Sequence, residues 1–231
     1  MNSNISYRWI PLESNPSIFN DYFYHLGLSK SFSFEELFSF DYKEVQNINI
    51  SNVQAVILNF LKVIPNDKLY PSYNFDNNFN VFYMLQTDPL TNACGVVAGL
   101  HAICNIDKSL NPIQQNSIIE EFIKTSNSPS SYAESLSTHE KWKEFHLKTA
   151  SKGSSEIPPN MEDVKHHYVA FIIKDKKLYE LDGRLNKPYC HKDIGEINRE
   201  DLLDKVIEIV KKRLANKEMN DLFSIMVLEK K

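Results

Sequence analysis

The sequence predicts a single α/β domain that contains an antiparallel element. Apolar runs typical of strands alternate with segments of helical periodicity, and two of the strand-like runs are joined by a short charged turn. No linker or internal repeat divides the chain, and 231 residues are enough to bury a substantial core. We therefore expect one domain spanning residues 1–231.

The amino-terminal part of the chain is predicted to begin with a helix. Pro16, directly after Asn15, is typical of a first helical position, and apolar residues follow at helical spacing until Gly27, which is expected to end the helix. A short second helix is predicted over residues 34–38. The near-continuous apolar run over residues 53–60 predicts a strand that is buried on both faces.

Residues 81–105 have the order strand, loop, helix. The apolar run over residues 81–85 is rich in β-forming residues, a turn-forming stretch follows, and a Cys-Gly pair then opens a long apolar segment. Asn92 is the predicted N-cap of this helix. Because His101 is the only polar residue among its apolar side chains, we expect the helix to be buried in the centre of the domain.

The second half of the chain continues with helical periodicity and then returns to strands. Periodicity disappears over residues 149–163, which predicts a long loop of the kind that is usually functional or disordered. A charged four-residue tip between two strand-like runs predicts a hairpin. In order, the elements expected here are helices over 112–123 and 132–148, strands over 167–173 and 178–181, a helix over 199–214 and a strand over 222–228.

Composition and charge argue against several classes of protein. A formal net charge of −4 without a basic block gives no reason to expect a nucleic-acid partner. The chain has no signal segment and no apolar run of membrane-spanning length, so we expect a soluble, cytoplasmic protein without a membrane partner. Its three cysteines, Cys94, Cys104 and Cys190, lack a CxxC spacing, so we expect no metal site, disulfide framework or cofactor.

Cys94 is a candidate nucleophile because it stands in the first turn of the predicted central helix. A thiol there lies at the positive end of the helix dipole, which favours the thiolate and lowers the pKa of the cysteine. The alternative is that Cys94 is a small core residue, as most free cysteines of cytosolic proteins are.

His167 and Asp182 are expected to meet across the predicted hairpin. His167 opens one strand, Asp182 ends the next, and the two positions fall nearly opposite each other about the tip. A carboxylate on one imidazole nitrogen leaves the other nitrogen free to act as a base toward a thiol. Each residue has an ordinary structural alternative, a strand-edge histidine and a turn acid, but with Cys94 they form the combination of which thiol hydrolases are built.

Gln86 is a candidate oxyanion donor. Its side-chain amide would act together with the backbone N–H of Cys94 on the oxygen that becomes negative in a tetrahedral intermediate. The alternative is an ordinary surface glutamine at the end of a strand.

Three motifs of the chain resemble those of the ubiquitin carboxyl-terminal hydrolases, in particular the small, single-domain L1/L3 type. QTDPLTNACG is similar to the segment from the family's glutamine to its nucleophile, HHYVAFI to its histidine strand, and LYELDGR to its aspartate strand. The resemblance extends over nearly the whole chain, from the segment WIPLESNP to the last predicted strand. It implies that Cys94 is the nucleophile, His167 the general base and then acid, Asp182 the group that orients His167, and Gln86 the oxyanion donor.

The same resemblance implies a fold, namely a central antiparallel sheet flanked by helices, with the papain-like cysteine protease architecture and the knotted backbone of the family. It also matches residues 149–163 to the crossover loop that restricts access to the active site. One feature departs from the family pattern. Gln86 and Cys94 are eight positions apart, whereas the family pattern has six, so two residues are inserted before the nucleophile.

By resemblance, the chain is expected to be a thiol-dependent deubiquitinase. It would be a monomer that hydrolyses the bond after the carboxy-terminal glycine of ubiquitin and releases small or unstructured adducts. Activity on the ubiquitin relative NEDD8 is expected by analogy with members of the same type. Two rivals stay open: another papain-like cysteine protease that is indifferent to folded ubiquitin, and a ubiquitin-binding module with weakened catalysis.

Four acids are expected to contact the arginine-containing tail of ubiquitin. Glu13 stands in the amino-terminal segment, and Glu156, Glu162 and Asp163 stand in or beside the 149–163 loop. Opposite charges would select the basic tail. For any one of these acids the alternative is an ordinary solvated charge.

Overall fold

The computed structural model describes residues 9–46, 48–151, 153 and 166–231. Its helices are α1 (Pro16–Leu26), α2 (Tyr42–Val45), α3 (Asn66–Leu69), α4 (Cys94–Cys104), α5 (Ile118–Thr125), α6 (Pro129–Thr138), α7 (Glu140–Ala150) and α8 (Leu202–Ala215). Its strands are β1 (Phe32–Glu36), β2 (Val53–Lys62), β3 (His166–Lys174), β4 (Lys177–Leu181), β5 (Tyr189–Cys190) and β6 (Met219–Lys230).

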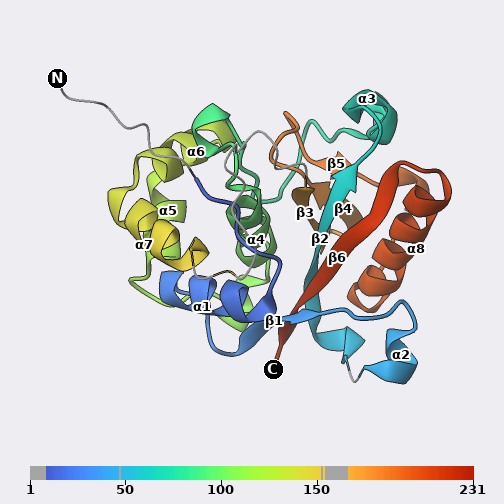
Figure 1. The fold of residues 1–231 in the computed structure, drawn as a ribbon, viewed down its shortest axis with the longest axis horizontal. Helices are drawn as coiled ribbons and strands as arrows, with labels where there is room; N and C mark the ends of the chain where they lie inside the picture. Colours follow the sequence, from blue (N-terminus) through green and yellow to red (C-terminus); the bar gives the residue numbers. More distant parts are fainter. Residues whose placement is uncertain (1–8, 47, 152, 154–165) are drawn as a thin grey trace.

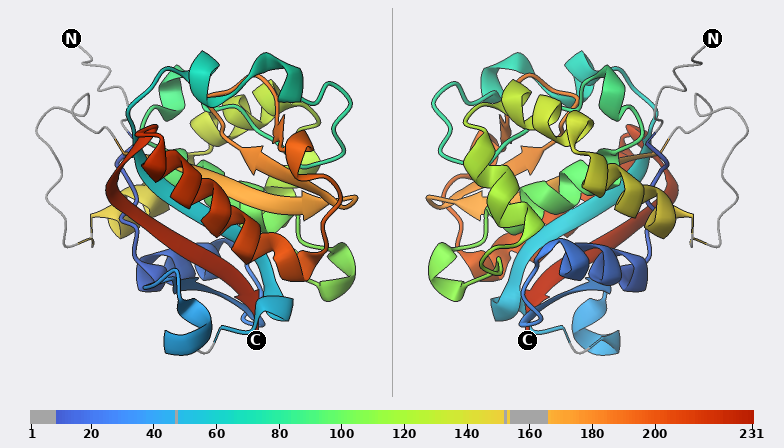
Figure 2. Two further views of the ribbon diagram at one scale, coloured as in Figure 1. Left: turned by 90° about the vertical axis from the view of Figure 1, so that its right-hand side faces the viewer. Right: turned by 90° about the vertical axis from the view of Figure 1, so that its left-hand side faces the viewer.

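The strands of the described residues form one sheet in the order β1-β6-β2-β3-β4-β5, and every neighbouring pair is antiparallel. In Figure 1, α8 lies on one side of this sheet, whereas α1 and α4 to α7 lie on the other. Figure 2 shows α8 in front of β2 and β6 in one view, and the other helices in front of the sheet in the opposite view. The predicted fold class, an antiparallel sheet flanked by helices, is confirmed.

The central strand β2 is buried on both faces, as predicted for residues 53–60. Its alternate side chains enter two cores: Ala55 and Ile57 join the core around α1 and α4, whereas Val56 and Leu58 join the core beneath α8. An interior strand with helices on both faces has no solvent-facing side, which explains its continuous apolar sequence.

The ends of α1 are as predicted, but the start of α4 is not. The side chain of Asn15 accepts a hydrogen bond from the backbone N–H of Ser17, and Gly27 ends α1 with a φ of 119°, a conformation that favours glycine. For α4, the predicted N-cap Asn92 is wrong. The cap position is Ala93, and no side chain caps this helix start.

The short helix predicted over residues 34–38 is wrong. Residues 32–36 form the edge strand β1, which pairs with β6. Phe32 and Phe34 are fully buried on the α1 side. Pairing and burial of alternate side chains therefore override the local helical preference.

The apolar run over residues 81–85 is also not a strand. The backbone N–H and carbonyl of Phe82 bond to the side chain of Asn105 at 2.7 and 2.9 Å, and the N–H of Met84 donates to Nε2 of His101 at 3.1 Å. Since these backbone groups are satisfied by side chains of and next to α4, they do not form a sheet ladder.

Three helix boundaries differ from the predictions. α5 begins at Ile118 instead of residue 112. The segment 132–148 consists of two helices, α6 and α7, which meet at His139. A 3₁₀ turn, Arg199–Asp201, precedes α8.

The predicted β3–β4 hairpin is confirmed, with a shorter tip than expected. Lys174 pairs with Lys177, so the tip is the two residues Asp175 and Lys176. Their φ angles of 49° and 59° fit the tight turn that the twist of a hairpin favours.

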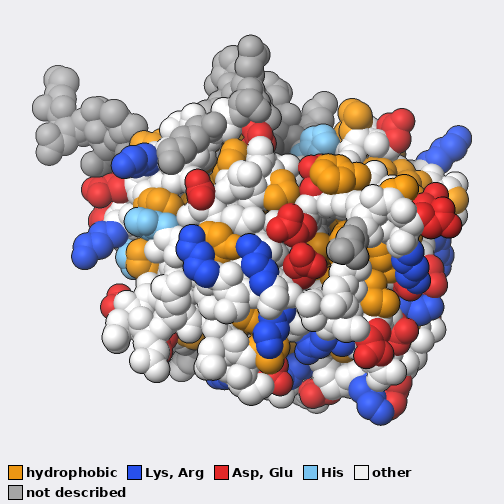
Figure 3. Space-filling model, turned by 90° about the horizontal axis from the view of Figure 1, so that it is seen from below, with side chains coloured by type: hydrophobic (Ala, Val, Ile, Leu, Met, Phe, Trp, Pro, Cys, Tyr) orange, Lys and Arg blue, Asp and Glu red, His pale blue; other side chains and the backbone are white. Residues whose placement is uncertain are grey.

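The surface carries charges of both signs. Figure 3 shows acidic and basic side chains interspersed over the face seen there. None of the described helices combines the length and the apolar character that crossing a membrane requires.

Candidate active site

Cys94 is the first residue of α4, and only 3% of it is exposed. The predicted burial of this helix is confirmed, because residues 94–103 are all buried. Gly99 permits the close approach of α1, since a Cβ at that position would lie 2.0 Å from the ring of Phe23. The thiol therefore lies at the positive end of a helix that is shielded from water, where dipole effects are least screened.

His167 and Asp182 meet at the open end of the β3–β4 hairpin. The ladder ends at the pair Ala170 and Leu181, and beyond it Nε2 of His167 donates to Oδ1 of Asp182 at 2.6 Å. Their side chains are 1% and 0% exposed. The backbone N–H of Arg184 donates to the same carboxylate oxygen at 2.9 Å, so the acid is held by two donors.

The Asp182 carboxylate is ionised despite its burial. Burial alone would raise its pKa, but the charge and hydrogen bond of His167, the charge of Lys62 and the N–H of Arg184 lower the pKa to about 2. At neutral pH the side chain is therefore a fixed negative charge, which stabilises an imidazolium.

The thiol of Cys94 and the ring of His167 form a coupled pair. Nδ1 of His167 is the ring nitrogen that Asp182 leaves available, and the Cys94 thiol lies near enough to interact with the ring. Burial would raise the pKa of Cys94, but the hydrogen bond and charge of His167, with Arg184 and the backbone of Tyr168, lower it. Burial would lower the pKa of His167, but Asp182 and Cys94 raise it. Both pKa shifts favour a thiolate–imidazolium pair.

Gln86 lies beside the turn that follows β4, but its amide is occupied. Its backbone N–H donates to the carbonyl of Gly183 at 2.6 Å. Its Nε2 donates to the carbonyls of Leu90 and Thr91 at 3.1 and 2.7 Å. Leu90 ends the 3₁₀ turn Asp88–Leu90, within the stretch that carries the inserted residues. A substrate oxyanion would therefore have to replace one of these carbonyls.

Comparisons with known proteins identify the family of the chain. A family model described as "Ubiquitin carboxyl-terminal hydrolase, family 1" matches residues 9–215. The chain belongs to this family. A ubiquitin carboxyl-terminal hydrolase of Aplysia californica is 32% identical over 215 residues, covering 90% of this chain and 95% of that protein. A probable ubiquitin carboxyl-terminal hydrolase of Dictyostelium discoideum is 30% identical over 235 residues, covering 97% and 89%.

A solved structure supports the fold. The crystal structure of the Trichinella spiralis UCH37 catalytic domain, bound to ubiquitin vinyl methyl ester, has a TM-score of 0.72 at 20% identity and covers 97% of this chain and 96% of that chain. Together, these comparisons confirm the predicted family, fold class and class of enzyme, since ubiquitin carboxyl-terminal hydrolases are cysteine peptidases. The roles of individual residues stay predictions.

Among the four acids predicted to bind the ubiquitin tail, Glu13 is the one within the described residues. Its Oε1 accepts a hydrogen bond from the Asn15 amide at 3.4 Å, and its Oε2 would lie 2.9 Å from a Cβ at Gly153. α7 extends to residue 150, so the predicted crossover loop begins later than residue 149. The others, Glu156, Glu162 and Asp163, lie outside the described residues, as does most of this loop.

Two basic residues act on the charges of Cys94 and Asp182, and neither was predicted from the sequence. The positive charge of Arg184 lowers the pKa of Cys94. Arg184 is part of the LYELDGR motif, so its place beside Asp182 is a signal that the sequence contains. Lys62 acts on Asp182 from the end of β2, and no local pattern marks it. In the described part of the chain, no group of three or more His, Cys, Asp or Glu side chains could hold a metal ion.

Replacing Gln86 by alanine should lower kcat by about 10²–10³-fold with little change in ubiquitin affinity, which is the usual cost of one oxyanion donor. The matched control is Gln114→Ala, because the Gln114 amide also donates to a backbone carbonyl, that of Leu28, at 3.2 Å. Steady-state kinetics on a ubiquitin amide would compare the two variants. A decrease in kcat of less than about threefold in Gln86→Ala would show that the Gln86 amide stays bonded to the carbonyls of Leu90 and Thr91. Backbone N–H groups would then be the oxyanion donors.

Proposed function

We propose that this chain is a thiol-dependent deubiquitinase that hydrolyses the bond after the carboxy-terminal glycine of ubiquitin and releases small or unstructured adducts. One observation carries the proposal. The buried pair of His167 and Asp182, joined at 2.6 Å, stands beside the helix-start thiol of Cys94 in a chain of the ubiquitin carboxyl-terminal hydrolase family.

The reaction begins with attack of the Cys94 thiolate on the carbonyl carbon of the terminal glycine. The C–S bond forms, and the carbonyl oxygen becomes an oxyanion that the N–H of Cys94 and the amide of Gln86 stabilise. The imidazolium of His167 then gives its proton to the leaving amine. The C–N bond breaks, the adduct leaves, and a thioester remains on Cys94.

Water completes the cycle. The neutral ring of His167 takes a proton from the water molecule as its oxygen attacks the thioester carbon. The C–S bond breaks, ubiquitin leaves as the carboxylic acid, which gives its proton to solvent, and the thiolate–imidazolium pair is restored. Asp182 keeps its charge throughout and holds the Nε2–H of the ring, so that Nδ1 stays directed at Cys94.

Ubiquitin is the proposed partner, and its extended tail is the part that the site would recognise. The Trichinella spiralis protein was solved with ubiquitin vinyl methyl ester, which supports this choice. We propose that the arginines of this tail bind Glu13 and, outside the described residues, Glu156, Glu162 and Asp163. We also propose that NEDD8 is a second substrate. The enzyme is proposed to be a monomer and to lie in the cytoplasm.

Turnover of a ubiquitin carboxy-terminal fluorogenic amide, compared with a tetrapeptide amide of the same terminal sequence, tests the proposal. We expect hydrolysis of the ubiquitin substrate and a far lower kcat/KM for the peptide. Equal kcat/KM values would instead indicate a papain-like protease that is indifferent to folded ubiquitin. Binding of ubiquitin without turnover would indicate a binding module with weakened catalysis, the rival that the occupied Gln86 amide favours.

A further inference from the structure

His101 is a buried residue of the nucleophile's own helix to which the mechanism above gives no task. It follows Cys94 by seven positions in α4 and is 0% exposed. Seven residues advance a helix by about 10 Å, so the His101 ring cannot touch the reacting atoms. A buried polar ring at this place must be explained by what it binds.

Both ring nitrogens of His101 bind backbone groups outside α4. Nε2 accepts from the N–H of Met84 at 3.1 Å, and Nδ1 lies 3.3 Å from the carbonyl oxygen of Leu181. Because Nε2 is an acceptor, the ring proton must be on Nδ1, which donates to Leu181. Burial lowers the pKa of His101 to about 4 although both backbone contacts oppose that shift, so the ring is neutral at physiological pH.

Each of these contacts is close in sequence to a residue of the proposed active site. Met84 precedes Gln86 by two positions, and Leu181 directly precedes Asp182. The His101 ring therefore connects the segment of the oxyanion donor, the strand end of the orienting acid and the helix of the nucleophile.

Tyr83 strengthens the same connection. Its ring stacks on that of His101, with centroids 5.0 Å apart and an interplanar angle of 6°. Its hydroxyl donates toward the carbonyl oxygens of Asp182 and Leu185, at 2.5 and 2.7 Å. The buried pair of rings thus contacts the β4 end at both Leu181 and Asp182.

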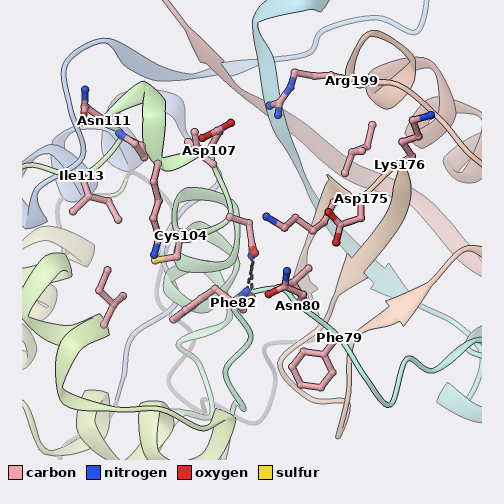
Figure 4. A pocket seen from close by; sticks show the side chains of 18 of the residues that line it. Phe79, Asn80, Phe82, Cys104, Asp107, Asn111, Ile113, Asp175, Lys176 and Arg199 are labelled. Carbon is pink, nitrogen blue, oxygen red and sulfur yellow. Dashed lines mark hydrogen bonds between the residues drawn. The ribbon is translucent and has the colours of Figure 1, made fainter.

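Asn105 holds the start of the same segment but makes a different connection. Its side chain bonds both backbone groups of Phe82 and the carbonyl of His101. Figure 4 marks one hydrogen bond at Phe82 with a dashed line. Phe82 and Asn105 line a hollow of about 1130 Å³ near Cys104, at the end of α4 opposite to Cys94. Asn105 therefore ties this segment to α4, whereas His101 also ties it to β4.

We propose that His101 is a positioning residue for the hydrolysis proposed above, because it fixes the Gln86 segment and the Asp182 end of β4 relative to Cys94. The inference rests on that proposed function. The His101 ring sets the distances between three parts of the chain, namely the Gln86 segment, the Asp182 end of β4 and the helix of Cys94. A displacement of about 1 Å in such a constellation can lower the rate by about 10²-fold.

Two conservative variants separate the two contacts of His101. In His101→Asn, the amide nitrogen takes the place of Nδ1 and keeps the donor to Leu181. In His101→Gln, the amide oxygen reaches the place of Nε2 and keeps the acceptor for Met84. His101→Ala removes both contacts.

His101→Ala should lower kcat for the ubiquitin amide by about 10²-fold at nearly constant KM. It should also raise the pH midpoint of Cys94 alkylation by iodoacetamide, measured by mass spectrometry of the Cys94 peptide. The reason is that a displaced Asp182 stabilises the imidazolium less, which disfavours the thiolate. His101→Asn should return the pH midpoint of alkylation to the wild-type value. His101→Gln should recover part of kcat but leave this midpoint raised.

His146 provides the control, since it is a second buried histidine, bonded to the Tyr22 hydroxyl and the Ile10 carbonyl in another part of the core. His146→Ala should lower the melting temperature but leave kcat and the alkylation midpoint unchanged. The proposal is overturned if His101→Ala behaves like His146→Ala. Should His101→Ala not fold, equal alkylation midpoints in the Asn and Gln variants would overturn it. Alkylation needs no ubiquitin, so this readout tests positioning even if the ubiquitin amide is not hydrolysed.

Discussion

Replacement of Cys94 by alanine should abolish hydrolysis of the ubiquitin amide. The thioester intermediate requires the sulfur atom, and removal of a protease nucleophile lowers kcat by a factor on the order of 10⁶. Ubiquitin affinity should be largely preserved, because a binding surface spread over many residues does not depend on one small buried side chain. The measurements are kcat with the fluorogenic amide and Kd by calorimetry.

The other two cysteines are matched controls for this experiment. Cys104 lies at the far end of α4 and Cys190 in β5, and burial raises the pKa of both thiols. Among the described residues, neither thiol has a histidine partner like that of Cys94, so alanine variants of both should keep kcat near the wild-type value. Loss of turnover in Cys104→Ala or Cys190→Ala, with turnover retained in Cys94→Ala, would show that the nucleophile is assigned wrongly.

The triad could be located in the sequence because each member has a local signal. A Cys-Gly pair opening an apolar helix marks Cys94, and the hairpin rule brings His167 and Asp182 to the same end of two paired strands. The 2.6 Å contact between the imidazole and the carboxylate agrees with that expectation, and the hairpin is centred between Asp175 and Lys176, as the prediction assumed.

The predicted secondary structure is wrong where the hydrogen-bond partner of the backbone is distant in sequence or is a side chain. Residues 34–38 look helical locally, but their partner is β6 at the other end of the chain. Residues 81–85 look like a strand, but the side chains of His101 and Asn105 bond the backbone groups of Met84 and Phe82. The Gln86 amide is held by turn carbonyls within the inserted stretch, and no spacing rule gives the geometry of that turn.

Asp182→Asn should lower kcat by about 10⁴-fold while the fold survives, by analogy with the serine protease triad. The carboxylate accepts the Nε2 proton of His167. An asparagine can instead present its NH₂ group to Nε2, which places the ring proton on Nδ1. Because Nδ1 then carries a proton on the side of Cys94, the ring cannot accept the proton of the thiol.

The pH dependence of this variant has a definite sign. In the wild type, burial opposes the imidazolium, but the Asp182 charge raises the pKa of His167. Burial likewise opposes the thiolate, but His167 lowers the pKa of Cys94. Both shifts widen the pH range in which the reactive ion pair is populated. Loss of the Asp182 charge should therefore narrow the kcat/KM profile from both sides and raise the pH midpoint of Cys94 alkylation.

Glu180 is the matched control for Asp182, since it is a second fully buried carboxylate and lies two residues earlier, in β4. It accepts hydrogen bonds from Arg213, Tyr70 and His191. Glu180→Gln leaves the buried Arg213 charge uncompensated, which should cost about 3–5 kcal/mol of stability. At temperatures where both variants stay folded, kcat should remain near the wild-type value in Glu180→Gln and collapse in Asp182→Asn. Undiminished kcat with an unchanged pH profile in Asp182→Asn would remove Asp182 from the mechanism.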